Sequence, residues 1–189
     1  MVTENKKSFC QHSKIYEVKK NFDSRGYLQP IREVGTNKIV FKAQDIYISQ
    51  SKKFAIRGVH LQLSSPPAKK IITVIEGEII AVTICCNNKC KLFGQARKFE
   101  LSSKKSEALL VPKLQAFGYL VLENKTLIIT CMDQPYDITK DFAINPVEFF
   151  TNDIQINRAI ISDRDQKASN LDVFLSKLHN KTLSKTRKS

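Results

Sequence analysis

The chain has 189 residues and is 42% hydrophobic, which suits one domain with a substantial apolar core. Its net charge of +13 would suit nucleic acid, but the lysines are spread out and no nucleic-acid-binding motif accompanies them, which disfavours that class. Residues 1–13 are polar and no apolar run approaches the roughly 20 residues of a membrane span, so a cytoplasmic protein is expected.

The N-terminal part of the chain predicts short strands separated by turns. Residues 15–21 alternate moderately between apolar and polar, and Asp23-Ser24-Arg25-Gly26 has the composition of a turn between two strands. Arg25 would then lie at the exposed tip of a hairpin. A further β-rich segment runs over residues 39–49.

The segment Arg57-Gly58-Val59-His60-Leu61-Gln62 is predicted to form a strand. Side chains alternate along a strand, so His60, Gln62 and Gly58 should face one way and Arg57, Val59 and Leu61 the other. A single histidine is more often a hydrogen-bonded core or surface residue than a base. Here Arg57 and Lys70 add two cations, and a base flanked by fixed cations suits an anionic substrate.

The β-branched runs 71–75 and 79–84, joined at Glu76-Gly77-Glu78, give the strongest hairpin signal in the chain. Further strands are expected over residues 98–101, 108–111, 118–122 and 126–131. Helical spacing of apolar residues predicts one C-terminal helix, through Leu171, Phe174, Leu175 and Leu178.

Eight or more short strands with turns between them predict an all-β sandwich or barrel whose mouth can hold one small ligand. We expect one domain over residues 1–179 and a basic, disordered tail over residues 180–189. The five cysteines are an odd number, which argues against a disulfide framework, and the 85–90 cluster lacks a second ligand pair for a metal.

Several motifs, in order, carry a family resemblance. They are Asp23-x-Arg25-Gly26, Arg57-Gly58-x-His60-x-Gln62, Lys70, Gly77-Glu78, Phe93-Gly94, Pro112, the segment 118–122, Tyr136, and the segment 161–165. Over residues 8–166 this order resembles the dTDP-4-dehydrorhamnose 3,5-epimerase family.

The resemblance implies a cupin-type jelly-roll barrel with a short C-terminal helix, usually a homodimer. It implies an isomerase that needs no metal and no cofactor and acts on a nucleoside-diphosphate-linked 4-keto-6-deoxy sugar, in deoxysugar or surface-polysaccharide biosynthesis such as that of lipopolysaccharide. The sequence supports the absence of a metal, because His12, His60 and His179 are the only histidines and a cupin metal site needs a cluster.

The resemblance also implies roles for individual residues. His60 is similar to the general base, Asp165 to the carboxylate that orients it, Lys70 to the lysine that stabilises the enolate oxygen, and Tyr136 to the tyrosine that returns a proton on the opposite face. Arg25 and Arg57 match positions that contact the nucleotide and its phosphates. Gln62, Phe117 and Tyr119 complete the expected substrate-binding set.

Each of these residues, taken singly, also has an ordinary structural explanation. Tyr136 could be a loop tyrosine, Asp165 a helix N-cap and Lys70 a strand-edge lysine. Phe117 stands where the family usually has a histidine, and Gln29 where it has a glutamate. A single-carbon epimerase, a 3,4-ketoisomerase and a non-catalytic sugar-nucleotide-binding module therefore stay open, although the presence of Tyr136 favours epimerisation.

Overall fold

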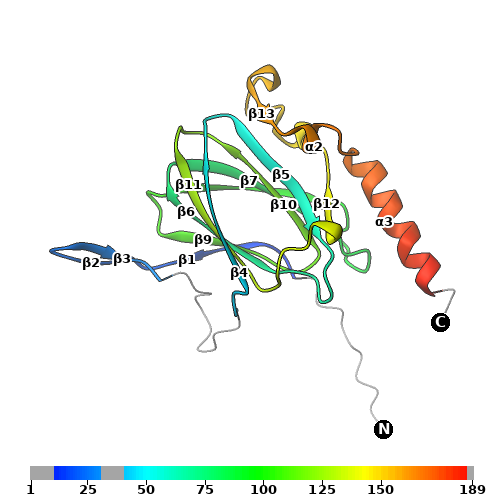
Figure 1. The fold of residues 1–189 in the computed structure, drawn as a ribbon, viewed down its shortest axis with the longest axis horizontal. Coiled ribbons are helices and arrows are strands. Elements are labelled where there is room, and N and C mark those ends of the chain that lie inside the picture. The colour runs from blue at the N-terminus through cyan, green and yellow to red at the C-terminus, as the bar shows by residue number, and fades with distance from the viewer. Residues whose placement is uncertain (1–10, 31–40, 187–189) are drawn as a thin grey trace, which may run out of the picture.

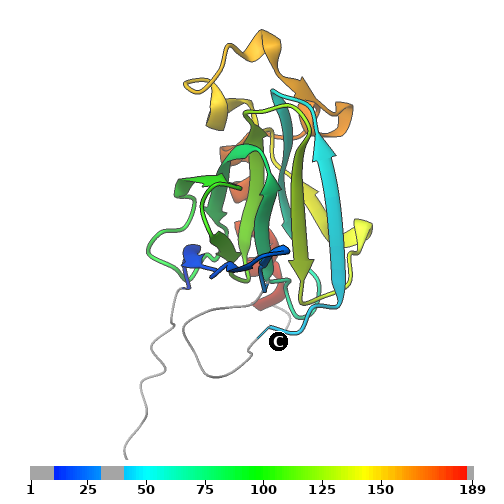
Figure 2. The same ribbon diagram turned by 90° about the vertical axis from the view of Figure 1, so that its left-hand side faces the viewer.

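The computed structural model describes residues 11–30 and 41–186, with only the backbone of 179–186, and most of it forms two packed sheets (Figures 1 and 2). The first sheet has the order β1 (Lys14–Glu17), β9 (Glu107–Val111), β6 (Lys70–Glu76), β11 (Thr126–Met132), β4 (Asp45–Ser51). The second has the order β12 (Asp141–Ala143), β5 (Ala55–Gln62), β10 (Gln115–Val121), β7 (Glu78–Cys85), β8 (Ala96–Ser102). The short strand β13 (Ile160–Ile161) pairs with β5 in parallel.

Strands β2 (Asn21–Asp23) and β3 (Gly26–Leu28) form the predicted hairpin, which extends away from the two sheets in Figure 1. Five helical segments follow the last long strand: η1 (Ile138–Lys140), α1 (Val147–Phe150), η2 (Ile156–Arg158), α2 (Asp163–Gln166) and α3 (Leu171–Thr186). The start of the predicted 39–49 segment lies outside the described residues.

The strongest predicted hairpin is wrong. Strands β6 and β7 form over the expected residues, but β6 pairs with β9 and β11 whereas β7 pairs with β10 and β8, so Gly77 connects two different sheets. Strands β10 and β11, joined through Lys125, are separated in the same way. A turn signal predicts where a strand ends, but it does not predict which strand becomes its neighbour. Repeated crossing between two packed sheets is the connectivity of a jelly roll.

Two apolar layers hold the fold together. Between the sheets lies a core that includes Ile72, Leu109, Ile128 and Phe117. The outer face of the second sheet carries a different set, which packs against the helices: Ile56, Val59, Leu61, Leu120, Phe149, Phe150 and Phe174. Helices α1 and α3 thus cover one sheet from outside and leave the interior face of β5 for the site.

Strand β5 contains a bulge that changes the predicted direction of one side chain. Across from β10, His60 pairs with Phe117 and Arg57 pairs with Tyr119, so Gly58 and Val59 together stand opposite Gly118 alone. An extra residue in one strand reverses the alternation beyond it. Arg57, expected to face away from His60, therefore lies on the same side and lines the same cavity.

Gly58 is required at this bulge. Its φ is +85°, and a Cβ atom built on it would lie 2.7 Å from the Phe117 carbonyl oxygen. We expect Gly58→Ala to lower the free energy of unfolding by about 2 to 3 kcal/mol, since a left-handed backbone and a backbone contact both oppose the methyl group. Denaturant unfolding measures this. Gly26→Ala is the control, because Gly26 has a φ of +130° and a Cβ atom built on it would meet no atom within 4 Å, so this variant measures the cost of the backbone conformation alone. An equal loss of unfolding free energy in the two variants would show that the contact with the Phe117 carbonyl oxygen has no effect.

The C-terminal helix is longer than expected. Helix α3 continues to Thr186, through most of the segment predicted as a disordered tail from residue 180. Leu and Lys favour helix, and neither Pro nor Gly interrupts the segment.

Cys85, Cys86 and Cys131 are free thiols, whereas Cys90 is disulfide-bonded, which the cysteine count did not anticipate. Within the described part of the chain, no helix combines the length and apolar character needed to cross a membrane.

Candidate active site

A cavity of about 700 Å³ opens between the two sheets at the interior face of β5. Its wall collects residues from β4, β5, β6, β10 and β11 and from the segments around η1, β13 and α2. The polar members of this wall are Tyr47, Arg57, His60, Gln62, Lys70, Tyr119, Thr130, Tyr136, Asp141, Ser162, Arg164 and Asp165. Eight of the nine residues expected from the sequence therefore lie on one surface, and Arg25 does not.

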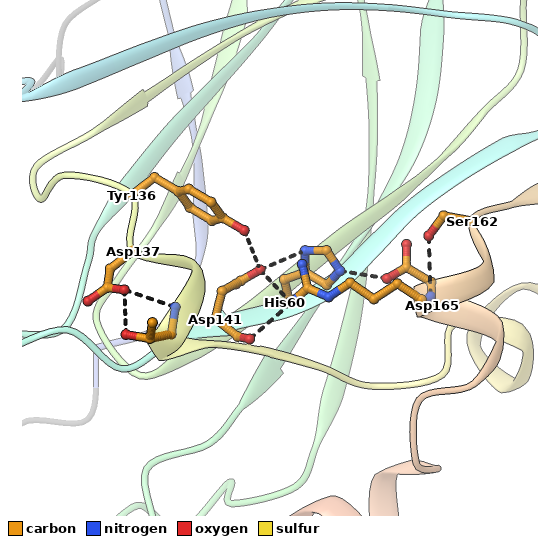
Figure 3. Close-up of polar contacts among 8 residues, drawn as sticks. His60, Tyr136, Asp137, Asp141, Ser162 and Asp165 are labelled. Carbon is orange, nitrogen blue, oxygen red and sulfur yellow. Dashed lines mark hydrogen bonds and ion pairs between the residues drawn. The ribbon is translucent and has the colours of Figure 1, made fainter.

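His60 is held by a carboxylate on α2 (Figure 3). Its Nε2 lies 2.7 Å from Asp165 Oδ1. Helix α2 is capped by Ser162, whose hydroxyl accepts a hydrogen bond from the Asp165 backbone N–H at 3.2 Å, so Asp165 is not the N-cap residue. An Nε2–H bond to a carboxylate leaves Nδ1 with the lone pair and stabilises the imidazolium. The imidazole is thus prepared to accept a proton at Nδ1.

The pKa of Asp165 is lowered. Burial alone would raise it, but the hydrogen bond and charge of His60, the Ser162 hydroxyl and the Arg164 cation outweigh that effect. A lowered pKa means that the folded state binds the acid proton less tightly than the unfolded chain does. The resulting stabilisation is complete above the ordinary value of 3.8 and is lost as pH falls through the lowered value.

We therefore expect Asp165→Asn to reduce the free energy of unfolding at neutral pH and to flatten its decline on acidification. Denaturant titrations of both proteins, from neutral pH to below pH 3.8, measure the difference. Parallel curves of unfolding free energy against pH for the two proteins across that range would show that Asp165 does not contribute this stabilisation.

Lys70 brings a cation to the wall from the first position of β6. Desolvation lowers the pKa of its ammonium group, and the Asp141 carboxylate opposes that shift. Its Nζ lies 6.0 Å from the centre of the Phe117 ring, over the ring face. A poorly hydrated ammonium group at a cavity wall stabilises a developing oxyanion more strongly than one in open water does.

Tyr136 lies in the loop before η1, with its hydroxyl directed to the same cluster. Its Oη donates to Asp141 Oδ2 at 3.2 Å, and its backbone N–H donates to Asp45 Oδ2 at 2.6 Å. The Tyr47 ring packs edge-on against it, with centroids 6.4 Å apart. Two contacts from β4 thus orient a loop tyrosine toward the histidine.

Asp141 and Arg164 are parts of the site that sequence reasoning missed. Asp141 begins β12, which pairs with β5 and places it beside Gln62. Its Oδ2 lies 3.4 Å from His60 Nδ1, and Arg164 Nη2 donates to the same oxygen at 2.9 Å. Burial opposes the charge of Arg164, but Asp141 and the Tyr136 hydroxyl raise its pKa overall. A carboxylate preceding the apolar run 142–144 was the available sequence signal.

The remaining expected residues occupy the wall with different exposure. Arg57 is exposed; its Nε donates to Ser51 Oγ at 2.9 Å and its Nη2 to the Gln50 carbonyl oxygen at 3.4 Å, which leaves Nη1 for a ligand. Gln62 donates to the Pro135 carbonyl at 2.7 Å, while its buried Oε1 has no protein partner. Tyr119 Oη lies 3.1 Å from Ser49 Oγ, and burial raises the pKa of Tyr119. Phe117, buried beside Lys70, contributes an apolar surface.

Arg25 lies at the hairpin tip, where its side chain is 88% exposed and pairs with Asp23 at 2.7 Å. It is not brought to the cavity of its own chain. In the described parts of the chain, no three His, Cys, Asp or Glu side chains are grouped so that they could share a metal ion.

Fold and site together define a jelly-roll enzyme built for proton transfer at carbon, with a carboxylate-supported histidine, a lysine and a tyrosine around one cavity. Residues 10–172 match the family model described as dTDP-4-dehydrorhamnose 3,5-epimerase. The chain belongs to this family, and its fold is the cupin-type jelly roll expected from the sequence.

Individual relatives agree with this assignment. The chain is 25% identical to the dTDP-4-dehydrorhamnose 3,5-epimerase of Shigella flexneri over 85% of this chain and 93% of the relative. It is 23% identical to that of Mycolicibacterium smegmatis, over 79% and 76% respectively. The enzyme structure from Sulfolobus tokodaii superposes with a TM-score of 0.74 at 25% identity, covering 85% of this chain and 90% of that one. A 3'-monoepimerase from Streptomyces bikiniensis in complex with dTDP-quinovose shares the fold, with a TM-score of 0.76 at 16% identity over 94% and 96%.

Proposed function

We propose that this protein inverts carbon centres next to the ketone of a dTDP-linked 4-keto-6-deoxy sugar. The observation that carries the proposal is the His60–Asp165 pair at 2.7 Å, on a cavity wall that also holds Lys70 and Tyr136. Removal of a proton from carbon beside a ketone needs a positioned base and a cation for the enolate oxygen. This wall supplies both, and Tyr136 adds a proton donor.

In the proposed reaction, His60 Nδ1 takes the α-proton and the C–H electron pair moves into the enolate. Asp165 stabilises the imidazolium through Nε2–H, and Lys70 stabilises the enolate oxygen. Tyr136 then donates its hydroxyl proton to the opposite face of the same carbon, and the ketone is restored with the centre inverted. Arg57 at the rim is placed to bind the diphosphate as a bidentate cation, and Gln62 Oε1 offers an unused acceptor to a sugar hydroxyl.

Product analysis tests this function. The protein is incubated with dTDP-4-keto-6-deoxy-D-glucose and, in parallel, with the GDP-linked 4-keto-6-deoxymannose, and the sugar coupling constants are followed by proton NMR. Inversion at both C3 and C5 of the dTDP sugar supports a 3,5-epimerase, and inversion at one supports a single-carbon epimerase. A 3-keto product would indicate a ketoisomerase, and an unchanged sugar in both arms would contradict the proposal.

We further propose that Arg25 completes the nucleotide site of a second copy in a homodimer. The hairpin that carries it extends from the barrel and exposes apolar side chains that need cover: Phe22 is 74% exposed and Leu28 72%. The outer side of β4 adds Ile46 and Ile48, exposed to 65% and 70%. Exposed apolar surface of this kind commonly marks an interface between protein chains. A hairpin that docks on a partner would bring Arg25 to that partner's cavity.

Mixing two impaired variants, at a dTDP-sugar concentration too low for Arg25→Ala to bind it well, tests this exchange. We expect Arg25→Ala to weaken dTDP binding and His60→Ala to lower turnover about 10³-fold. Refolding the two together at equal concentration should restore about a quarter of the wild-type activity, because half of the dimers are mixed and each mixed dimer holds one intact site. Activity no greater than that of the separate variants would show that Arg25 does not act across a dimer.

A further inference from the structure

One carboxylate oxygen joins the two groups that move protons in the proposed reaction. Asp141 Oδ2 lies 3.4 Å from His60 Nδ1 and accepts a hydrogen bond from Tyr136 Oη at 3.2 Å (Figure 3). The Asp141 side chain is only 2% exposed. Neither the family resemblance nor the sequence assigned a role to it.

The surroundings keep this carboxylate in place. Arg164 Nη2 donates to Asp141 Oδ2 and also to the Asp141 backbone carbonyl oxygen, each at 2.9 Å. Strand pairing of β12 with β5 fixes the backbone beside that of His60. The charged and titratable groups that face Asp141 are thus His60, Tyr136, Arg164 and, through its charge, Lys70.

After each inversion, the proposed reaction leaves the base and the acid in the opposite protonation states from those in which they started. His60 has gained a proton at Nδ1 and is a cation, while Tyr136 has lost its hydroxyl proton and is a phenolate. Neither can act again until one proton has moved from the histidine to the tyrosine. For an enzyme that inverts two carbons of one bound sugar, this reset must occur while the ligand fills the cavity and limits the access of water.

We propose that Asp141 carries this proton. The Nδ1–H proton passes to Asp141 Oδ2, and the proton on that carboxyl passes to the Tyr136 phenolate oxygen. His60 is then neutral with a lone pair at Nδ1, Tyr136 again carries its hydroxyl, and Asp141 is again a carboxylate paired with Arg164. The step consumes no co-reactant. Asp141 is therefore a relay residue that touches both catalytic side chains. This inference rests on the proposed epimerase function.

Comparison of single and multiple turnovers tests the relay. With enzyme in excess over dTDP-4-keto-6-deoxy-D-glucose, Asp141→Asn should perform the first inversion within about threefold of the wild-type rate, since base, lysine and acid start in the correct state. The singly inverted sugar should then accumulate, and the steady-state rate should fall about 100-fold, because the reset must wait for solvent. Added formate, a small carboxylate, should restore part of the steady-state rate.

Two further variants separate the relay from a structural role. Asp141→Glu keeps the carboxylate and should retain more steady-state activity than Asp141→Asn. Asp153→Asn removes a carboxylate paired with Lys98 away from the cavity and should change neither phase. An equal fall in the first and later inversions, without rescue by formate, would overturn the relay and leave the epimerase intact. A wild-type protein that inverts no carbon would overturn the proposed function, and the relay with it.

Discussion

Replacement of His60 by alanine is expected to lower the rate of inversion by about 10³-fold, since a positioned general base contributes roughly that factor. Binding of dTDP should stay within about twofold of wild type, because the proposed reaction assigns His60 to the sugar and arginine to the diphosphate. Inversion is followed by NMR of the sugar and binding by calorimetry.

A matched histidine provides the control for this variant. His12, which precedes β1, does not line the cavity, and His12→Ala should retain wild-type turnover. Comparable losses in the two variants would indicate a general effect on folding. An active His60→Ala protein would remove the base from the mechanism.

Tyr136→Phe should separate proton exchange from inversion. The base and the lysine are intact, so the α-proton is still removed, but the opposite face lacks a donor. We expect inversion to fall about 100-fold while exchange of the α-proton with solvent persists. The phenylalanine keeps the ring contact with Tyr47, which makes a loss through misplacement of the loop small. The measurement is the ratio of deuterium incorporation to inversion in D₂O. Parallel loss of both would contradict the role of Tyr136 as the proton donor.

Local patterns in the sequence predicted most strands and the C-terminal helix, because alternation and apolar spacing act over a few residues. They did not predict strand partners: the β6 and β7 segments carry a strong hairpin signal yet enter different sheets. Nor could alternation alone place Arg57 beside His60, since the bulge at Gly58 and Val59 depends on the facing strand. These features are set by tertiary packing, which has no local signature.

The candidate site likewise contains residues that the sequence predicts and residues that only the folded structure reveals. Residues carried by motifs, such as His60, Lys70 and Asp165, were predicted and are brought together. Asp141 was missed because it belongs to a three-residue strand whose pairing with β5 spans about 80 positions of sequence. Arg25 was expected to contact the nucleotide, and it lies at an exposed hairpin tip away from the cavity of its own chain, which led to the proposal that it acts on a second copy. A single sequence gives the least information about functional residues that reach a site through long-range strand pairing or through the assembly of chains.

The proposed reaction requires that this protein removes α-protons from a nucleotide-linked keto sugar through His60. The most direct test is incubation of the wild-type protein with dTDP-4-keto-6-deoxy-D-glucose in D₂O, with proton NMR of C3 and C5 and His60→Ala in parallel. We predict that deuterium enters both carbons in the wild type and neither in the variant. Absence of exchange in the wild type, or equal exchange in the two proteins, would show that His60 does not remove these protons.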